Sequence, residues 1–458
     1  PKVTVQLPIF NEMYVAERVI IAAAQLDYPS HLLQIQVLDD STDETSEIVQ
    51  RVVKSLSEKG IDIQHLHRVD RVGYKAGALQ AGLAMATGKF LAIFDADFVP
   101  PHDFLLRALP YLSEPDVAFV QTRWGHLNKH YSWLTYLQSL AIDGHFMVEQ
   151  FVRSRAGYWF NFNGTAGIWR RAALEDAGGW KSDTLTEDLD LSYRAHLKGW
   201  RGEYARDIVV PGELPVSFGA YRRQQHRWAR GSMECALKLG PRVWRAPIPL
   251  MQKFQATLHL GGYSVHLLLF LLTLIYPLVA IFTVRYFHLS TLYGFAYLFA
   301  VTSIAPTLFF ITAQQQLGRP WWRLLPKILA ISVVGSGMML NSIRAAWQIL
   351  RQYENVFERT AKFGIEQDNQ SWTRKRYQLR FDGIVYPEIV LGIYSLWTAW
   401  LAASLNSLGI AFYALLFGSG LIVVSGVTIV QSWAVYRDRK ARAQRMQVED
   451  GLTGQVRA

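Results

Sequence analysis

Short apolar runs alternate with longer amphipathic stretches along the first part of the chain. The runs at residues 3–7, 35–38 and 90–94 are β-branched or strongly apolar and have the length of strands. Helical patterns lie between them, near residues 12–25, 42–59 and 75–86. Because strands that alternate with helices build βαβ units, we predict an α/β domain with a mixed, mostly parallel sheet.

Longer apolar runs dominate the second half of the chain. A helix needs about 20 apolar residues to cross a bilayer core of roughly 30 Å. Four segments have about this length, at residues 260–284, 292–314, 383–405 and 407–435. We therefore predict a catalytic domain over residues 1–228, interface helices over 229–259 and an α-helical transmembrane region over 260–435.

A further apolar segment, 324–350, contains polar residues such as Asn341 and Arg344. The loop 351–382 behind it is rich in Lys and Arg, as is the tail 436–458. If 324–350 crossed the membrane, this loop and the tail would both lie outside, against the positive-inside rule. We therefore predict that 324–350 is an interface or re-entrant helix and that the loop and the tail are cytosolic.

Composition agrees with a membrane protein. The 458 residues are 50% hydrophobic, and the net charge of +10 comes partly from basic residues beside the apolar spans. No groove-reading motif accompanies this charge, so no nucleic-acid partner is expected. The single Cys235 excludes an internal disulfide and fits a cytosolic catalytic half. The chain opens at Pro1 within a strand pattern, and we expect a further segment upstream, such as another transmembrane helix.

Four short motifs follow one another before the apolar spans. They are Asp39-Asp40, Asp95-Ala-Asp97, Thr186-Glu187-Asp188 and Gln224-Gln-His-Arg227-Trp228. Taken singly, each has a structural explanation as a solvated loop, a helix cap or a membrane anchor. Together they supply what transfer of a sugar from a nucleotide diphosphate requires: carboxylates for a divalent metal, a carboxylate base, and a cationic and aromatic clamp.

The first two motifs follow predicted strands, where ligands bind in α/β domains. Asp95 and Asp97 offer hard oxygen ligands for Mg²⁺ or Mn²⁺ together with a diphosphate. Asp39 and Asp40 are expected to accept hydrogen bonds from the base or ribose of the nucleotide. Lys75 begins the next helix and suits a phosphate.

The last two motifs lie on predicted helices. Glu187 and Asp188 are candidate catalytic carboxylates, and Asp188 would be the general base that takes the proton of an acceptor hydroxyl. The alternative is a favourable interaction with the helix dipole. Gln224, Arg227 and Trp228 share one helix face because they are three or four positions apart, and they offer an amide, a guanidinium and an indole plane to diphosphate and sugar.

With these motifs in order, the chain resembles the processive branch of glycosyltransferase family 2. Over most of residues 3–240 it looks like the plant cellulose synthase-like A and C proteins, which include glucomannan mannosyltransferases. Similar stretches stand at residues 36–43, 73–78, 92–98, 162–167 and 224–228. The resemblance implies a GT-A fold for the catalytic domain.

The resemblance also implies residue roles. Asp40 and Lys75 would hold the nucleotide, Asp95 and Asp97 the diphosphate and metal, and Asp188 would be the base. Acceptor binding is implied for Asn163, Gly164 and Thr165, and diphosphate and acceptor binding for Gln224, Arg227 and Trp228. Phe357, Arg359, Thr360 and Lys362 match the gating loop Phe-x-Val-Thr-x-Lys of cellulose synthase, with Arg359 in place of the usual Val.

We expect an enzyme that extends a β-glycan, 1,4-linked, from UDP-glucose or GDP-mannose and exports it. It would be integral to the plasma membrane or a Golgi-type membrane, with nucleotide sugar, glycan and bilayer as partners; oligomeric state and accessory export proteins are open. One alternative is a glycolipid synthase that adds a single sugar to a membrane lipid, in the manner of ceramide glucosyltransferases. A non-catalytic scaffold or transporter is the other, but Glu388, near one end, is the sole charged residue noted in the apolar spans.

Overall fold

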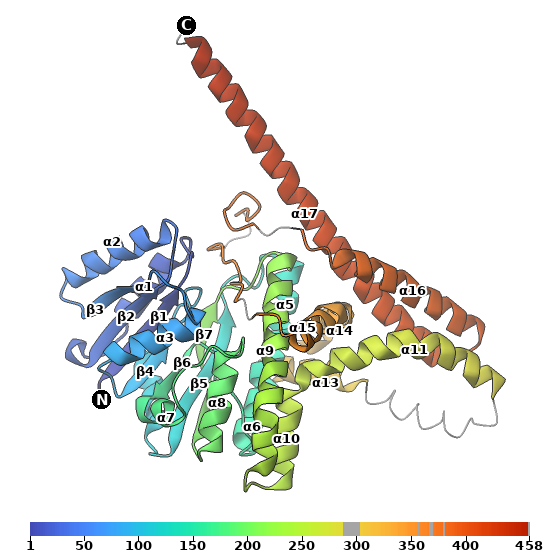
Figure 1. Cartoon of the computed structure of the whole chain (residues 1–458), viewed down its shortest axis with the longest axis horizontal. Coiled ribbons are helices and arrows are strands. Elements are labelled where there is room, and N and C mark those ends of the chain that lie inside the picture. The colour runs from blue at the N-terminus through green and yellow to red at the C-terminus, as the bar shows by residue number, and fades with distance from the viewer. Residues whose placement is uncertain (287–302, 355–356, 366–369, 379–380, 457–458) are drawn as a thin grey trace.

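The computed structural model describes the chain except residues 287–302, 355–356, 366–369, 379–380 and 457–458 (Figure 1). Its N-terminal half is built on one seven-stranded sheet in the order β3-β2-β1-β4-β6-β5-β7. β6 runs antiparallel to both neighbours, and the other strand pairs are parallel. The predicted mixed, mostly parallel sheet is therefore confirmed. The strands are β1 Val3–Ile9, β2 Leu33–Asp39, β3 Ile63–His67, β4 Phe90–Ile93, β5 Val117–His126, β6 Gly167–Arg170 and β7 Arg201–Gly212.

Helices cover both faces of the sheet, and each face buries its own apolar cluster. One cluster joins alternate residues of β1 and β2, such as Val5 and Val37, to α1, α2 and α4. The other joins Leu38 and Leu91 to α3, α7 and α8. Alternation along the strands thus sends Val37 and Asp39 towards α1 and α2, and Leu38 towards the opposite face. The helices are α1 Ala16–Ala24, α2 Thr45–Ser57, α3 Tyr74–Met85, α4 Phe104–Ala108, α5 Trp133–Gly144, α6 Phe151–Arg155, α7 Arg171–Asp176 and α8 Glu187–Leu197.

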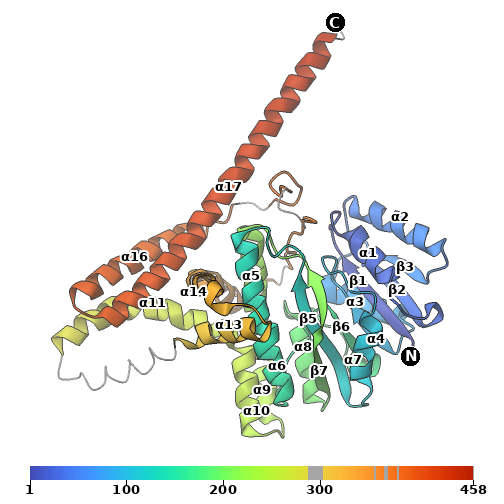
Figure 2. The same cartoon turned by 180° about the vertical axis from the view of Figure 1, so that it is seen from behind.

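One long helix, α9 (Phe218–Arg245), joins the sheet domain to the apolar half of the chain. A boundary at residue 228 would fall inside this helix, which continues without a break and is followed by α10 (Leu250–Leu260). In both views α9 and α5 stand between the sheet and the apolar helices (Figures 1 and 2). The two halves therefore share a structural element.

The apolar half contains α11 (Val265–Arg285), α13 (Ala305–Gln316), α14 (Trp321–Gly337), α15 (Met339–Leu350), α16 (Val385–Ser404) and α17 (Leu408–Val456). α14 and α15 lie between the sheet domain and the outer helices: α14 contacts α5 and α17, and α15 contacts α9 and α11. α17 continues far beyond its neighbours to the C-terminus (Figure 1). α14 and α15 thus form a middle layer, and α9 also contacts α17 directly.

Within the described residues, three helical segments are long and apolar enough to cross a membrane: Gly262–Arg285, Trp321–Leu350 and Leu408–Ala441. The first and third coincide with predicted spans. The second contains 324–350, whose assignment to the interface stays a prediction. Segment 383–405 forms α16, which is not among the three, and 292–314 lies partly outside the described residues.

A buried ion pair ties α9 to the apolar helices. The guanidinium of Arg222 donates to both carboxylate oxygens of Glu388 on α16, one of them at 3.1 Å, and to the hydroxyl of Thr428 on α17 at 3.1 Å. Arg222 is 1% exposed and Glu388 0%. The carboxylate noted in the apolar spans is therefore the partner of a cation on the helix that carries Gln224, Arg227 and Trp228.

We expect Glu388→Gln to lower the stability of the protein strongly, because it leaves the Arg222 cation buried without its counter-charge. Removal of one partner of a buried pair costs about 3–5 kcal/mol. Thermal unfolding in detergent measures the loss. The double replacement Arg222→Met with Glu388→Leu should recover much of it, because neither charge then remains. A melting temperature equal to that of the unchanged protein in the single variant would contradict this role.

Candidate functional site

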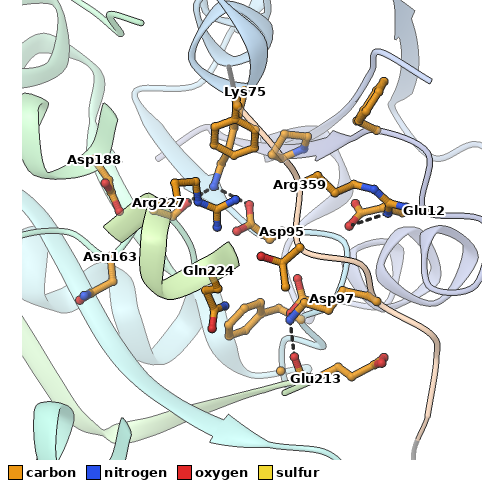
Figure 3. Close-up of a pocket in the computed structure, with 18 of the residues that line it drawn as sticks. Glu12, Lys75, Asp95, Asp97, Asn163, Asp188, Glu213, Gln224, Arg227 and Arg359 are labelled. Atoms are coloured by element: carbon orange, nitrogen blue, oxygen red, sulfur yellow. Dashed lines mark hydrogen bonds and ion pairs between the residues drawn. The ribbon is translucent and has the colours of Figure 1, made fainter. Parts of the chain in front are cut away.

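A pocket at the carboxyl ends of β1, β2, β4 and β7 brings the four motifs together (Figure 3). Its walls come from the sheet edge, from α8 and α9, and from the segment 357–362. The predicted residues that line it are Asp40, Lys75, Asp95, Asp97, Asn163, Gly164, Glu187, Asp188, Gln224, Arg227, Trp228, Phe357, Arg359, Thr360 and Lys362. Residues far apart in the sequence thus share one cavity.

Lys75 lies at the centre of the carboxylates. Its Nζ is 2.6 Å from Asp95 Oδ1 and 3.7 Å from Glu187 Oε1, and it donates to the carbonyl of Gly164 at 2.9 Å. Burial alone would lower the pKa of Lys75, but Asp95 and Glu187 raise it, so the side chain remains an ammonium. Lys75 therefore joins two of the four motifs to the predicted acceptor residue Gly164.

Asp95 and Asp97 present hard oxygen atoms to the pocket. Burial and the charge of Asp97 raise the pKa of Asp95, although Lys75 opposes the shift. Asp97 Oδ2 lies 2.6 Å from Nζ of Lys362. A pair of neighbouring carboxylates, one half-buried and one buried, that pairs with two lysines has the donor chemistry for a divalent cation. Asp95 and Asp97 would hold it, and the backbone N–H of Asp95 is fixed by the hydroxyl of Thr165 at 2.8 Å.

Asp188 is the second residue of α8 and points into the pocket near Lys75 (Figure 3). Burial, reinforced by the charge of Glu187, raises its pKa well above the ordinary carboxyl value, while Lys75 opposes the shift. Gly164 stands directly against it, since a Cβ there would lie 2.9 Å from Asp188 Oδ2, and its φ is +80°. A carboxylate whose pKa is raised towards neutral pH suits a general base.

The motif on α9 lines the pocket with Gln224, Arg227 and Trp228, as the helical spacing predicts. The guanidinium carbon of Arg227 lies 4.5 Å from the ring centroid of Phe357, and Arg227 donates to the carbonyl of Glu358 at 3.4 Å. Arg227 therefore faces both the carboxylates and the loop that covers them.

The segment Phe357 to Lys362 closes one side of the pocket. Phe357 stacks on Tyr74, with 5.9 Å between ring centroids. Lys362 pairs with Asp97, and Glu213 accepts the backbone N–H groups of Phe363 and Gly364 at 2.9 and 3.0 Å. Buried apolar residues continue this anchor, because Ala361, Phe363 and Ile365 pack with Val216.

Sequence reasoning missed two carboxylates that hold this segment. Nη1 of Arg359 lies 3.6 Å from Oε1 of Glu12. Burial raises the pKa of Glu12 to about 7, although the charge of Arg359 opposes this shift. Glu213 directly follows β7. Neither residue belongs to a recognisable sequence motif. The signal in the sequence was Arg359, which stands where the gating loop of cellulose synthase has Val, because a cation at that position calls for a carboxylate partner.

Two predicted site residues lie behind the pocket wall. Asp39 is 0% exposed and faces His65 and His67, and Thr165 contributes its hydroxyl to Asp95. Burial would raise the pKa of Asp39, but hydrogen bonds from His65, Ser41 and Ser46 hold it well below the usual range. Neither residue is among those that line the pocket, and direct contact of either with a ligand stays a prediction.

Asp40 does reach the pocket, held by an unpredicted partner. Arg68 Nε and Nη2 donate to its two oxygens at 2.8 and 2.6 Å. Beside it, the guanidinium of Arg71 lies 3.4 Å from the ring centroid of Phe10, and both residues line the pocket. Asp40, Phe10 and Arg71 together offer a polar and a planar surface to a nucleotide.

Asn163 is fixed on the opposite side by polar neighbours. Its amide oxygen accepts from Gln150 at 2.5 Å, its amide nitrogen lies 3.0 Å from His145 Nε2, and its backbone N–H donates to Gln121 at 2.7 Å. His145 and Gln150 bound a π-helical turn after α5, His145–Gln150, a feature that often marks functional sites. The predicted acceptor residue is thus held in one orientation.

Two family models match the chain. The model for glycosyltransferase-like family 2 matches residues 1–231, and the model for cellulose synthase matches residues 171–317. The matched ranges include all four motifs and overlap on α8 and the start of α9.

Curated relatives are similar over the first half of the chain. Glucomannan 4-beta-mannosyltransferase 2 of Arabidopsis thaliana is 50% identical over 236 residues, which are 50% of this chain and 44% of the relative. The probable glucomannan 4-beta-mannosyltransferase 7 of Oryza sativa subsp. japonica is 46% identical over 260 residues, 56% of this chain and 44% of the relative. The matched part thus spans less than half of the length of these relatives.

Among solved structures, a mannosyltransferase from Pyrobaculum calidifontis in complex with GDP-Man and Mn²⁺ is 21% identical, with a TM-score of 0.49. The match covers 77% of this chain and 88% of that one. TarS of S. aureus, residues 1–349, in complex with UDP-GlcNAc, is 16% identical, with a TM-score of 0.42 over 77% of this chain and 93% of that one.

Proposed function

Because the chain belongs to glycosyltransferase-like family 2, we propose that it is a membrane-integrated, inverting hexosyltransferase that lengthens a β-1,4-glycan and exports it. The observation that carries the proposal is the pocket in which Asp40, Lys75, Asp95, Asp97 and Asp188 meet the Gln224-to-Trp228 face beneath the segment 357–362. The names of the relatives, glucomannan 4-beta-mannosyltransferases, support a mannan-type product. The three apolar segments support membrane integration.

The geometry supports a single displacement. Asp40, Phe10 and Arg71 would hold the nucleotide, and Lys75 and Arg227 the diphosphate. Asp188 would accept the proton of the acceptor hydroxyl while its oxygen forms a bond to the anomeric carbon. The bond from that carbon to the diphosphate breaks, and its electron pair leaves with the nucleoside diphosphate. Mg²⁺ or Mn²⁺ held by Asp95 and Asp97, when bound, supplies positive charge for this leaving group.

Product analysis tests the proposal. Purified protein would be incubated with UDP-glucose or GDP-mannose and Mg²⁺ or Mn²⁺, and the product sized before and after lipid extraction. A polymer that remains after extraction and is cut by an endo-β-1,4-mannanase or glucanase supports it and identifies the sugar. A single-sugar lipid would instead establish the glycolipid synthase. No product from either donor, with an acceptor oligosaccharide present, would overturn both.

The covering segment gives a further prediction. Phe357→Ala removes the ring contacts with Tyr74 and Arg227, which are worth roughly 1–2 kcal/mol. We expect transfer to fall by roughly 5- to 30-fold and hydrolysis of the donor to rise relative to transfer, because the pocket admits more water. Product yield and free sugar are measured together.

Phe357→Tyr keeps the stacked ring and should retain transfer. Arg376→Ala is a control in the same loop, because its ion pair with Glu44 at 2.5 Å lies outside the pocket. An unchanged polymer yield from Phe357→Ala would show that the ring takes no part in closing the pocket.

A further inference from the structure

Two histidines and one aspartate form a separate cluster at the edge of the sheet. β3 is the outermost strand next to β2, and His65 and His67 occupy alternate positions on it, so both side chains leave the same face. Asp39 pairs in register with His67 and points to that face as well. It is the face covered by α1 and α2, whereas Asp40 turns into the catalytic pocket. The cluster therefore lies outside the pocket.

The donor atoms of the cluster converge on one point. Asp39 Oδ2 lies 2.9 Å from His65 Nε2 and 3.1 Å from His67 Nδ1. One donor atom from each of the three side chains falls within 4.8 Å of the other two, and within the described residues no other group of three or more His, Cys, Asp or Glu side chains does so. The second oxygen, Oδ1, accepts the backbone N–H of Ser41 at 2.9 Å, which fixes the carboxylate plane.

Hydrogen bonds alone also satisfy this geometry if each ring donates an N–H to Oδ2. Two features favour a cation instead. Two imidazoles and one carboxylate are the ligand set that Zn²⁺ takes at sites with an open position, and the strand edge gives access. The side chains of His65 and His67 are 18% and 39% exposed, while that of Asp39 is 0% exposed.

We propose that Asp39, His65 and His67 bind a transition-metal ion, Zn²⁺ in the first instance, at a site distinct from the Asp95 and Asp97 pair. Oxygen-only ligands suit Mg²⁺ at that pair, whereas imidazoles suit Zn²⁺. The ion would join the ends of β2 and β3. The residues that directly follow the two strands continue this link, because Arg68 after β3 donates two hydrogen bonds to Asp40 after β2. The site would therefore brace the nucleotide wall from behind.

The test replaces each histidine by the amide that places a nitrogen at the same point. His65→Gln mimics Nε2 and His67→Asn mimics Nδ1, so hydrogen bonds to Asp39 persist while the metal ligands are lost. The chelated full-length protein, in excess Mg²⁺, is titrated with Zn²⁺ by calorimetry, and bound zinc is counted after desalting. His31→Gln, on the exposed turn Ser30–Leu32, is the matched control. Cys235 is buried and offers no competing thiol at the surface.

We expect the unchanged protein and His31→Gln to bind one zinc more per chain than the double variant His65→Gln with His67→Asn. Each single variant should lose at least about tenfold in affinity at this site. Zinc should raise the melting temperature of the unchanged protein but not that of the double variant. Equal zinc content in all variants would overturn the proposal. The absence of bound zinc in the unchanged protein in excess Mg²⁺ would overturn it as well. Either result would leave a hydrogen-bonded cluster. Neither result depends on which sugar the enzyme transfers.

Discussion

Asp188→Asn should lower the rate of sugar transfer by on the order of 10² to 10⁴, while nucleotide binding is retained. The amide keeps the size of the side chain but cannot take the proton of the acceptor hydroxyl, and the loss of a general base has this magnitude. Initial rates with a donor and an oligosaccharide acceptor, together with nucleotide titration, measure both properties. Asp207→Asn is the control, since its side chain is 70% exposed and does not line the pocket.

The raised pKa of Asp188 makes the effect depend on pH in a defined direction. Only the ionised base is active, so the rate of the unchanged enzyme should fall as the pH drops towards and through this pKa, which burial moves from the acidic range towards neutrality. The same shift means that the ionised form destabilises the fold as the pH rises through that pKa. Asp188→Asn should therefore melt no lower than the unchanged protein at neutral pH. Near-normal turnover by this variant would remove Asp188 from the role of base.

Asp97→Ala should weaken metal-dependent nucleotide binding by roughly 10- to 100-fold or more. The change removes one hard oxygen ligand of the metal. Even the loss of a residue that only hydrogen-bonds to a metal ligand lowers metal affinity by this factor. Lys362 loses its counter-charge at the same time, so the segment 357–362 is less firmly held. Calorimetric titration with the nucleoside diphosphate, with and without Mn²⁺, measures the change.

Two comparisons separate the effect of losing the metal from the effect of loosening the segment 357–362. Lys362→Met breaks the contact with Asp97 but keeps both carboxylates, so metal-dependent binding should survive while transfer declines. Chelation of the unchanged protein should reproduce the nucleotide-binding defect of Asp97→Ala. Full activity in excess chelator would contradict a divalent metal at Asp95 and Asp97.

The pocket residues of the Asp95 and Gln224-to-Trp228 motifs were found from local periodicity, whereas Asn163, Gly164 and the segment 357–362 were found through the family resemblance. Asp95 and Asp97 follow a buried strand, and Gln224, Arg227 and Trp228 fall on one helix face, so their convergence needed only the strand ends and the helical repeat. Asp39 belongs to the same strand end as Asp40 but does not line the pocket, because adjacent strand positions point to opposite faces.

Glu12, Glu213 and Arg68 could not be found in this way. Each acts through a partner brought close only by tertiary packing, such as Arg359 for Glu12 and the backbone of Phe363 for Glu213. The same limit applies to the fold. Alternation predicted β1, β2 and β4, but β3, β5, β6 and β7 were missed. The domain boundary predicted directly after Trp228 lies within the continuous helix α9.

The continuous helix α9 fixes the distance between Arg222 and Arg227. Arg222 is tied to α16 and α17, and Arg227, which lines the pocket with the carboxylates, follows five residues later on the same helix. At about 1.5 Å of rise per residue, the two lie roughly 8 Å apart along the helix axis. In the proposed membrane-integrated enzyme, with α17 in the bilayer, α9 fixes the distance between the site of sugar transfer and the apolar helices. The path that the proposed product would follow to those helices is then set by the geometry of one helix.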